Sequence, residues 1–274
     1  MRAIGFAQGM RGDLIIQTVA ARAFKQLYPD SKLVMGVNRQ YADMIPLFYQ
    51  HPYFDSFHIY DGYDNWPNPK DQAYLQHAKY DIIFPAMPKR HNEATWWRTE
   101  HQAANAATIY GMPAPSNLQC SLNPWFAPYL DDFRDYVAFN YIGGFYAGYP
   151  NSKSYSPERA AEIVKLIKSM GYKVIVLGDP NEPELAGTER IKMSYVDSVK
   201  TMLSCKAFVG IDSGLTWAAS AYSFPTLACY SDSYYGTHVS SIQPINPNGR
   251  YLSAPTLDEI PLDQIVESLT SLLS

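Results

Sequence analysis

Two charged side chains that could do chemistry stand in segments that separate an expected strand from an expected helix. Asp13 ends the glycine-containing segment 8–13, where a carboxylate can act as a general base or can cap the following helix. Lys153 lies in the long segment 141–155. Its ammonium could neutralise a phosphate, and a solvated surface lysine is the ordinary alternative.

A third segment, 210–216, joins an expected strand to an expected helix and reads Gly-Ile-Asp-Ser-Gly-Leu-Thr. The backbone N–H groups of Ser213, Gly214 and Leu215 would project from the start of that helix, where the helix dipole also favours an anion. A diphosphate is a natural ligand for such a site. A helix cap followed by a glycine that allows close packing explains the same residues, and the local pattern leaves both explanations open.

Aromatic and basic residues gather between positions 89 and 101. Trp96, Trp97 and Arg98 are adjacent there, and tryptophans beside cations suit stacking on a sugar or binding an anionic acceptor. One of the two rings can equally belong to the core, because neighbours on a helix point about 100° apart. We expect part of an acceptor-binding surface in this segment.

Several motifs of other enzyme classes are missing from the sequence. It has no Asp-x-Asp pair, no His-Glu-x-x-His, no Gly-x-Ser-x-Gly and no Cys-x-x-Cys, and its six histidines are scattered. We therefore expect chemistry without a bound metal or cofactor.

Composition narrows the class of protein further. The chain has 274 residues, 47% of them hydrophobic, and a net charge of −4, which excludes disorder and argues against bulk nucleic-acid binding. No apolar run is long enough for a transmembrane helix, and the N-terminus turns polar too soon for a signal peptide. Three widely spaced cysteines fit a reducing compartment. We expect a cytoplasmic protein that can still act at the surface of the inner membrane.

Short apolar strands alternate with amphipathic helices along the chain. Expected strands lie at 2–7, 32–37, 56–60 and 81–84, and then at 136–141, 173–177, 207–211 and 226–230. Expected helices lie at 13–27, 41–49, 100–110, 157–170, 196–203, 215–222 and 262–273, and the breaker-rich residues 62–70 are expected to form a loop.

The alternation pauses in a proline-rich stretch, so we expect a linker near 122–135 between domain 1–128 and domain 129–274. Each domain is then an α/β unit with a parallel sheet. Ligands bind beyond the carboxyl ends of such strands, and a cleft between two such domains is the default active site.

Taken together, these motifs resemble the heptosyltransferase family of glycosyltransferases, which includes the ADP-heptose:lipopolysaccharide heptosyltransferases. The resemblance covers three segments in the family's order: 12–30, which opens with Gly12-Asp13; 153–182, which opens with Lys153; and 212–226, which opens with Asp-Ser-Gly. In the third segment Trp217 stands where the family usually has histidine.

The resemblance implies a GT-B fold, with two Rossmann-like domains facing across a cleft, and metal-independent, inverting sugar transfer from a nucleotide donor. Asp13 would then be the general base. The terminal helix would pack back toward the first domain. The donor would bind to the second domain and the acceptor to the first. The implied donor residues are Lys153, Glu182, Asp212, Ser213, Gly214, Leu215, Thr216 and Trp217, and the implied acceptor residues are Arg11, Gly12, Trp96, Trp97 and Arg98.

Three alternatives stay open. Another GT-B-type nucleotide-sugar enzyme, an epimerase or a hydrolase, would share the diphosphate site without an acceptor site. A non-catalytic relative would bind a nucleotide or a glycan, an idea that Trp217 suggests. A transferase acting on nucleic acid would need a basic surface, for which residues 89–98 are the candidate.

Overall fold

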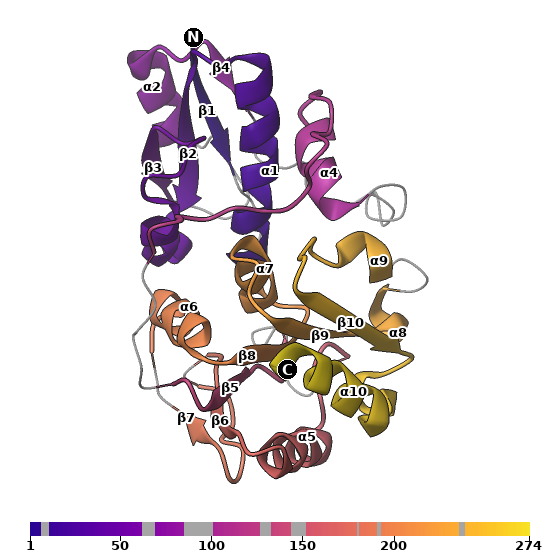
Figure 1. The fold of residues 1–274 in the computed structure, drawn as a ribbon. Helices are drawn as coiled ribbons and strands as arrows, with labels where there is room; N and C mark the ends of the chain where they lie inside the picture. Colours follow the sequence, from indigo (N-terminus) through magenta and orange to yellow (C-terminus); the bar gives the residue numbers. More distant parts are fainter. Residues whose placement is uncertain are drawn as a thin grey trace. The chain divides into compact units, whose positions relative to one another are not determined.

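The computed structural model describes residues 1–6, 11–61, 69–84, 101–126, 133–143, 152–179, 181–190, 193–235 and 239–274 (Figure 1). Within them the chain forms two units, Met1–Trp125 and Phe126–Ser274. Each unit has its own parallel sheet with helices packed against it.

Four parallel strands make up the sheet of the N-terminal unit, in the order β3-β2-β1-β4. The strands are β1 Arg2–Phe6, β2 Lys32–Asn38, β3 Ser56–Tyr60 and β4 Ile82–Ile83. Their connections contain α1 Arg11–Leu27, the 3₁₀ helix η1 Arg39–Phe48 and α2 Pro69–Ala78, and α4 Gln102–Thr108 follows β4. Parallel neighbours need such crossover connections, because a tight hairpin joins only antiparallel strands.

Side chains alternate between the two faces of this sheet. Ile4 and Val34 point to one face and pack with Leu75 of α2. On the other face α1 lies against the strands, and α4 packs alongside α1 (Figure 1). Small side chains let these two helices approach closely, since the buried residues of α4 are all alanines: Ala103, Ala104, Ala106 and Ala107.

A buried arginine of α1 forms hydrogen bonds with the segment that follows α4. Arg22 is only 8% exposed, and its guanidinium donates to the backbone carbonyls of Asn117 at 2.5 Å and Gln119 at 2.8 Å. It also donates to the Tyr53 hydroxyl at 3.2 Å. Carbonyl oxygens thus satisfy a charge that burial would otherwise make costly.

A buried histidine supports the same segment. His51 Nε2 lies 3.0 Å from the Ser121 hydroxyl, and His51 Nδ1 accepts the Tyr53 N–H at 3.3 Å. The pKa of His51 is lowered from 6.5 to about 4, mainly by burial and also by the nearby positive charge of Arg22, while the contact with the Ser121 carbonyl partly offsets these effects. The imidazole is therefore neutral at pH 7, which lets Nδ1 act as an acceptor.

Six parallel strands make up the sheet of the C-terminal unit, in the order β10-β9-β8-β5-β6-β7. The strands are β5 Tyr136–Phe139, β6 Lys173–Val176, β7 Glu189–Arg190, β8 Ala207–Ile211, β9 Thr226–Ser231 and β10 Gly249–Ala254. The helices are α5 Pro157–Ser169, α6 Tyr195–Ser204, α7 Gly214–Ala221, α8 Asp232–Tyr235, α9 Val239–Ile242, the 3₁₀ turn Leu257–Glu259 and α10 Leu262–Leu273.

The main core of this unit lies on the face of the sheet that α5 and α10 cover. Val209 and Leu227 of the strands pack there with Ile163 of α5 and Ile265 of α10. The apolar face of the terminal helix is therefore occupied within its own unit. Helices α6 and α7 also contact the strands, and they lie on the side of the sheet opposite α5 and α10 (Figure 1).

The sequence pattern predicts most of these elements, but not the short helical segments Asp232–Tyr235, Val239–Ile242 and Leu257–Glu259. Four further differences stand out. Residues 41–49 lie in a 3₁₀ helix that begins at Arg39 and contains Pro46, not in an α-helix. The expected loop 62–70 is wrong at its end, because α2 begins at Pro69, and proline is favoured at the first position of a helix. The pattern also does not predict β7 and β10, which are the edge strands of their sheet and carry no continuous apolar run.

Candidate functional site

The strand order of each sheet reverses at one point, and parallel α/β sheets bind ligands outside the carboxyl ends of the strands there. In the C-terminal unit the reversal falls between β5 and β8, and in the N-terminal unit it falls between β1 and β4. Lys153 follows β5 and Asp212 follows β8, whereas Asp13 follows β1. The topology therefore puts these three sequence candidates at the sheet edges where parallel α/β folds commonly bind ligands.

Lys153 and Asp212 meet at the edge of the C-terminal sheet although 59 positions separate them in the sequence. The Lys153 ammonium donates to Asp212 Oδ2 at 2.7 Å. The side chains of Lys153 and Asp212 are 25% and 20% exposed, so a ligand could reach both. Because Asp212 directly precedes Ser213, the N-cap of α7, the ammonium is held beside the start of a helix.

The start of α7 is capped and still offers N–H groups. The Ser213 hydroxyl accepts the Thr216 N–H at 3.4 Å, and the Ser213 carbonyl accepts the Trp217 N–H at 3.3 Å. Gly214 and Leu215 are the first two residues of the helix, and the N–H groups at those positions have no acceptor within an α-helix. The capping explanation and the anion-site explanation are thus compatible here.

Glycine at position 143 lets the chain bring Lys153 to this point. A Cβ at Gly143 would lie 2.8 Å from the Lys153 carbonyl oxygen and 3.0 Å from Ile211 Cδ1. The Gly143 N–H also donates to the Ser154 hydroxyl at 3.1 Å. A side chain at position 143 would therefore push away the backbone that carries Lys153.

Glu182 lies beside the carboxyl end of β6 and is already paired. Its Oε2 lies 3.1 Å from Arg190 Nη2, and both side chains are more than nine-tenths buried. Burial raises the pKa of Glu182, and the hydrogen bond from Arg190 partly offsets this. A Cβ at Gly178 would lie 2.0 Å from Glu182 Oε2, so glycine there leaves room for the carboxylate. The expected contact of Glu182 with a donor stays a prediction.

Besides Glu182, three more of the expected donor residues have buried side chains. Leu215 is 5% exposed, Thr216 is 1% exposed and Trp217 is 3% exposed. The Thr216 hydroxyl donates to the Ile211 carbonyl, which ties α7 to the end of β8. Trp217 would reach a donor only if its ring left this packed position.

At the edge of the N-terminal sheet, Asp13 is the third residue of α1 and is 9% exposed. It lies inside the first turn, where the helix dipole stabilises a carboxylate, and is not the N-cap. Arg11 donates to Asp43 of η1 at 2.9 Å, and its guanidinium lies 5.5 Å from the centre of the Tyr41 ring. Gly12, between Arg11 and Asp13, is partly exposed.

The other expected acceptor residues, Trp96, Trp97 and Arg98, follow β4 in the sequence and lie outside the described residues.

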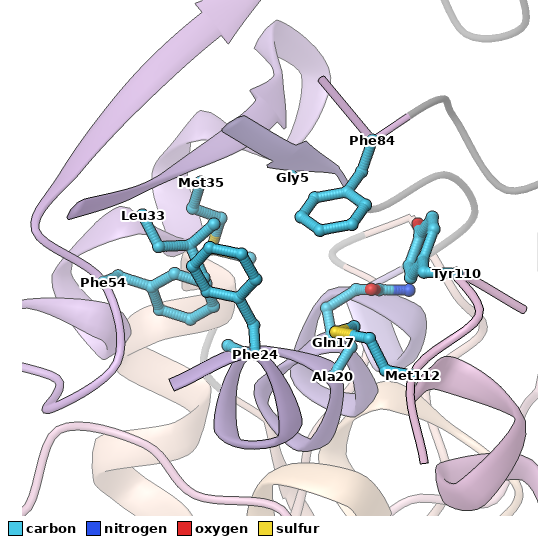
Figure 2. Close-up of a pocket in the computed structure, with 11 residues that line it drawn as sticks. Gly5, Gln17, Ala20, Phe24, Leu33, Met35, Phe54, Phe84, Tyr110 and Met112 are labelled. Atoms are coloured by element: carbon cyan, nitrogen blue, oxygen red, sulfur yellow. The ribbon is translucent and has the colours of Figure 1, made fainter. Parts of the chain in front are cut away.

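A pocket lies between α1 and the sheet of the N-terminal unit (Figure 2). Counted out to its open mouth, it holds about 320 Å³ of empty space. The rings of Phe24, Phe84 and Tyr110 gather at it, and the side chain of Gln17 adds a polar group. None of the described residues that line it is charged, so these residues lack the groups that a diphosphate would need.

Two kinds of feature are absent from the described parts of the chain. No three His, Cys, Asp or Glu side chains in those parts converge as a metal site would require. None of the helices in those parts combines the length and the hydropathy needed to cross a bilayer.

No protein-family model matches the sequence, and no curated protein matches it either. Solved structures do match. The glycosyl transferase family 9 structure from Veillonella parvula DSM 2008 has a TM-score of 0.76 at 16% identity, covering 99% of this chain and 97% of that chain. The E. coli ADP-heptose lps heptosyltransferase II has a TM-score of 0.75 at 16% identity, with 100% and 98% covered. E. coli heptosyltransferase WaaC, solved with ADP, has a TM-score of 0.67 at 15% identity, with 99% and 100% covered.

These similarities extend over nearly the whole length of each chain, so the fold is that of the solved heptosyltransferases. The predicted fold class, GT-B with two Rossmann-like domains of parallel sheet, is confirmed at the level of the two domains.

Proposed function

We propose that this protein is a glycosyltransferase that moves a sugar from a nucleoside diphosphate sugar to a hydroxyl group of a glycan or lipid-linked acceptor. One observation carries the proposal: Lys153 and the start of α7 meet at the reversal point of a sheet, in a chain with the fold of solved heptosyltransferases. An ammonium and helix N–H groups together stabilise the negative charge that develops on a departing diphosphate.

The C-terminal unit is the donor domain in this proposal. Lys153 neutralises the diphosphate, and the N–H groups of Gly214 and Leu215 donate to its oxygens. Asp212 and Ser213 hold this site in shape, because the first pairs with Lys153 and the second caps α7. Glu182 is the candidate for contact with the nucleoside, through the lone pairs that Arg190 leaves available.

The N-terminal unit supplies the base and binds the acceptor. Asp13 takes the proton of the acceptor hydroxyl while the oxygen of that hydroxyl forms a bond to the anomeric carbon of the donor sugar. The bond from that carbon to the diphosphate breaks, and the nucleoside diphosphate leaves with the electron pair. Such a direct displacement inverts the anomeric centre. Arg11 and Gly12, beside Asp13, and Trp96, Trp97 and Arg98, after β4, are the proposed acceptor contacts.

We propose that the transfer needs no metal, because an ammonium and helix N–H groups can balance the charge of the leaving group. The three cysteines are buried and unpaired, which supports a reducing, cytoplasmic location where the protein could also meet lipid-linked acceptors at the inner membrane. The net charge of −4 disfavours nucleic acid as the acceptor.

The first experiment is a thermal-shift screen of the purified chain against nucleoside diphosphates and nucleotide sugars with EDTA present. A ligand at 100 times its dissociation constant should stabilise the fold by about 2.7 kcal/mol. The selected donor is then incubated with oligosaccharide and lipid-linked acceptors, and release of the nucleoside diphosphate is measured.

Acceptor-dependent release in EDTA supports the proposal. Binding without release under any condition would favour a non-catalytic relative, and release without an acceptor would favour a hydrolase. No stabilisation by any nucleotide would overturn the proposed donor site.

A further inference from the structure

The pocket between α1 and the N-terminal sheet is a feature that the proposed chemistry has not used. It reaches the point where the strand order of this sheet reverses, because Gly5 of β1 and Phe84, directly after β4, both line it. The Phe84 N–H donates to the Ile4 carbonyl at 2.9 Å, so Phe84 extends the pairing of the two strands. The pocket therefore lies where parallel α/β sheets commonly bind ligands.

Small residues on the strand and on the helix leave this space open. A Cβ at Gly5 would lie 3.4 Å from Phe84 Cδ2 and 3.7 Å from Leu33 Cδ1, so it would fill space between two side chains that line the pocket. On the helix side, Ala20 and Ala21 line the pocket with one methyl group each. The pocket is thus a consequence of which residues these two elements carry.

Aromatic rings and thioethers make up much of the described lining. The rings of Phe24 and Phe84 meet edge to face with centroids 5.6 Å apart, and the rings of Phe84 and Tyr110 are tilted with centroids 5.2 Å apart (Figure 2). The side chains of Met35 and Met112 add two sulfur atoms. Aromatic rings pack on one another in such geometries, and a thioether sulfur makes favourable contacts with a ring. The lining therefore favours an aromatic group over an alkyl group of the same size.

The size of the pocket agrees with one ring. An apolar cavity of about 150 Å³ stays dry and binds benzene. This pocket holds about 320 Å³ when it is counted out to its open mouth, which leaves room for a ring and a short substituent. Burial of a ring there removes apolar surface from water without displacing bound water that polar groups hold.

Helix α1 connects the pocket to the proposed base. Gln17, Ala20, Ala21 and Phe24 line the pocket along one face of the helix. Asp13 lies four residues before Gln17, and residues four apart are neighbours on the same face. The helix rises about 6 Å between them. A ring in the pocket would therefore bring a hydroxyl on a short substituent past the Gln17 amide to the Asp13 carboxylate.

We propose that this pocket binds an aryl group of the acceptor, attached within a few atoms of the hydroxyl that receives the sugar. The inference rests on the proposed function, because it takes Asp13 as the base. It narrows the acceptor to molecules whose hydroxyl lies close to an aromatic ring, such as aryl glycosides. The pocket contributes affinity for the ring, and Asp13 contributes the chemistry.

The first test is NMR of the full chain labelled with ¹³C in its methionine methyl groups, with benzyl alcohol as the probe and no nucleotide present. Benzyl alcohol should shift the signals of Met35 and Met112, because the ring current of a bound aromatic group displaces nearby methyl signals. The signals of Met44 and Met202, which are buried and do not line the pocket, should stay in place. Cyclohexylmethanol, which lacks the aromatic ring, should bind about fivefold more weakly.

The second test fills the pocket. Ala20→Leu adds an apolar side chain from α1 and keeps a good helix former, and it should weaken binding of benzyl alcohol by about tenfold. Ala78→Leu is the matched control, because it adds the same atoms to α2, which packs on the other face of the sheet. With the donor that the thermal-shift screen selects, Ala20→Leu should also lower kcat/KM for benzyl alcohol as acceptor by about tenfold and leave the affinity for ADP unchanged.

Each outcome bears on the inference. Unshifted signals of Met35 and Met112 would overturn it, and so would equally tight binding of cyclohexylmethanol. Unchanged affinity or unchanged kcat/KM in Ala20→Leu would overturn it as well. If Ala20→Leu does not fold, the methionine signals of the parent chain decide.

The failure of the inference and that of the proposed function can be told apart. If a nucleotide binds and the signals of Met35 and Met112 do not respond, only the inference fails. If both signals respond and no nucleotide sugar is a donor, the proposed function fails, and the assignment of the pocket to an acceptor fails with it.

Discussion

In the proposed function, the two units use the same strand-order reversal for opposite chemistry. In both, the candidate residues follow the strands at which the sheet order reverses. In the C-terminal unit the cation faces into the site, because Lys153 pairs with Asp212 beside the start of α7. In the N-terminal unit the nearby cation, Arg11, pairs with Asp43 of η1. The carboxylate of Asp13 lies in the first turn of α1. The sheet fixes where a site lies, and a few charged partners decide whether it suits an anion or serves as a base.

The buried polar groups of the two units also differ. Arg22 and His51 of the N-terminal unit are satisfied mainly by backbone and hydroxyl groups. In the C-terminal unit the buried Arg190 pairs with the Glu182 carboxylate in addition to backbone carbonyls. The first unit therefore has a histidine held neutral in its interior, and the second has a charge pair. We expect the two units to respond differently to acid.

Asp13→Asn should have the largest effect. Loss of a general base should slow sugar transfer by about 10²–10⁴-fold, while the affinity for ADP, whose site we propose in the C-terminal unit, stays unchanged. The measurement combines nucleoside diphosphate release with calorimetry. Asp43→Asn is the matched control, since it removes a nearby carboxylate that pairs only with Arg11 in the described contacts. Full activity in Asp13→Asn would disprove the assignment of the base.

Acid should weaken the N-terminal unit first. The pKa of His51 is lowered from 6.5 to about 4 in the folded chain, so between these values the unfolded state binds a proton that the folded state does not. The contribution of His51 to stability should be complete above pH 6.5 and should be lost as the pH drops from 6.5 to 4, by about 3 kcal/mol in total. Urea unfolding at pH 7 and pH 4.5, followed by fluorescence, measures this loss.

His51→Gln should reduce that pH dependence, while His77→Gln, on the exposed side of α2, should preserve it. The same acid sensitivity in His51→Gln as in the parent would show that another group is responsible.

Lys153→Met tests the cation of the donor site. Losing a charge-assisted hydrogen bond should weaken ADP binding by about 10- to 100-fold. Arg11→Met, which removes the corresponding cation of the other unit, should leave the ADP affinity unchanged. If the two variants bind ADP equally, the proposed division of roles between the units is wrong.

Gly143→Ala should have the smallest effect of the four. The new Cβ would lie 2.8 Å from the Lys153 carbonyl oxygen, so the segment carrying Lys153 must shift, and ADP affinity should fall by about tenfold or less. Gly5→Ala in the other unit is the control, because its Cβ would meet Phe84 at an ordinary 3.4 Å. Calorimetry with ADP measures both, and unchanged affinity in Gly143→Ala would show that Lys153 tolerates displacement.

Much of the fold could be predicted from local patterns. Ser156 followed by Pro157 predicts the start of α5, and the Ser156 hydroxyl accepts the Arg159 N–H at 3.1 Å as expected. The apolar strands of the two sheets can be predicted equally well, because each is a short apolar run bounded by turn-forming residues. The edge strand β10 could not be predicted in the same way, because most of its residues are at least partly exposed and it has no continuous apolar run.

Part of the candidate site could also be predicted from local patterns. A charged residue between a strand and a helix is visible in the sequence, which is how Asp13, Lys153 and Asp212 were identified. Their partners were not, because pairing depends on which strands become neighbours. No local pattern indicates that Arg190 would neutralise Glu182, or that the ring of Trp217 would point into the unit.

The sequence by itself determined the α/β class, the parallel sheets and the segments that carry the chemistry, because periods of 2 and 3.6 residues and helix caps are local properties. Only the tertiary structure decided that Lys153 meets Asp212 across 59 positions and that a pocket lies between α1 and the N-terminal sheet. Those facts depend on the strand order and register of each sheet, which long-range packing sets.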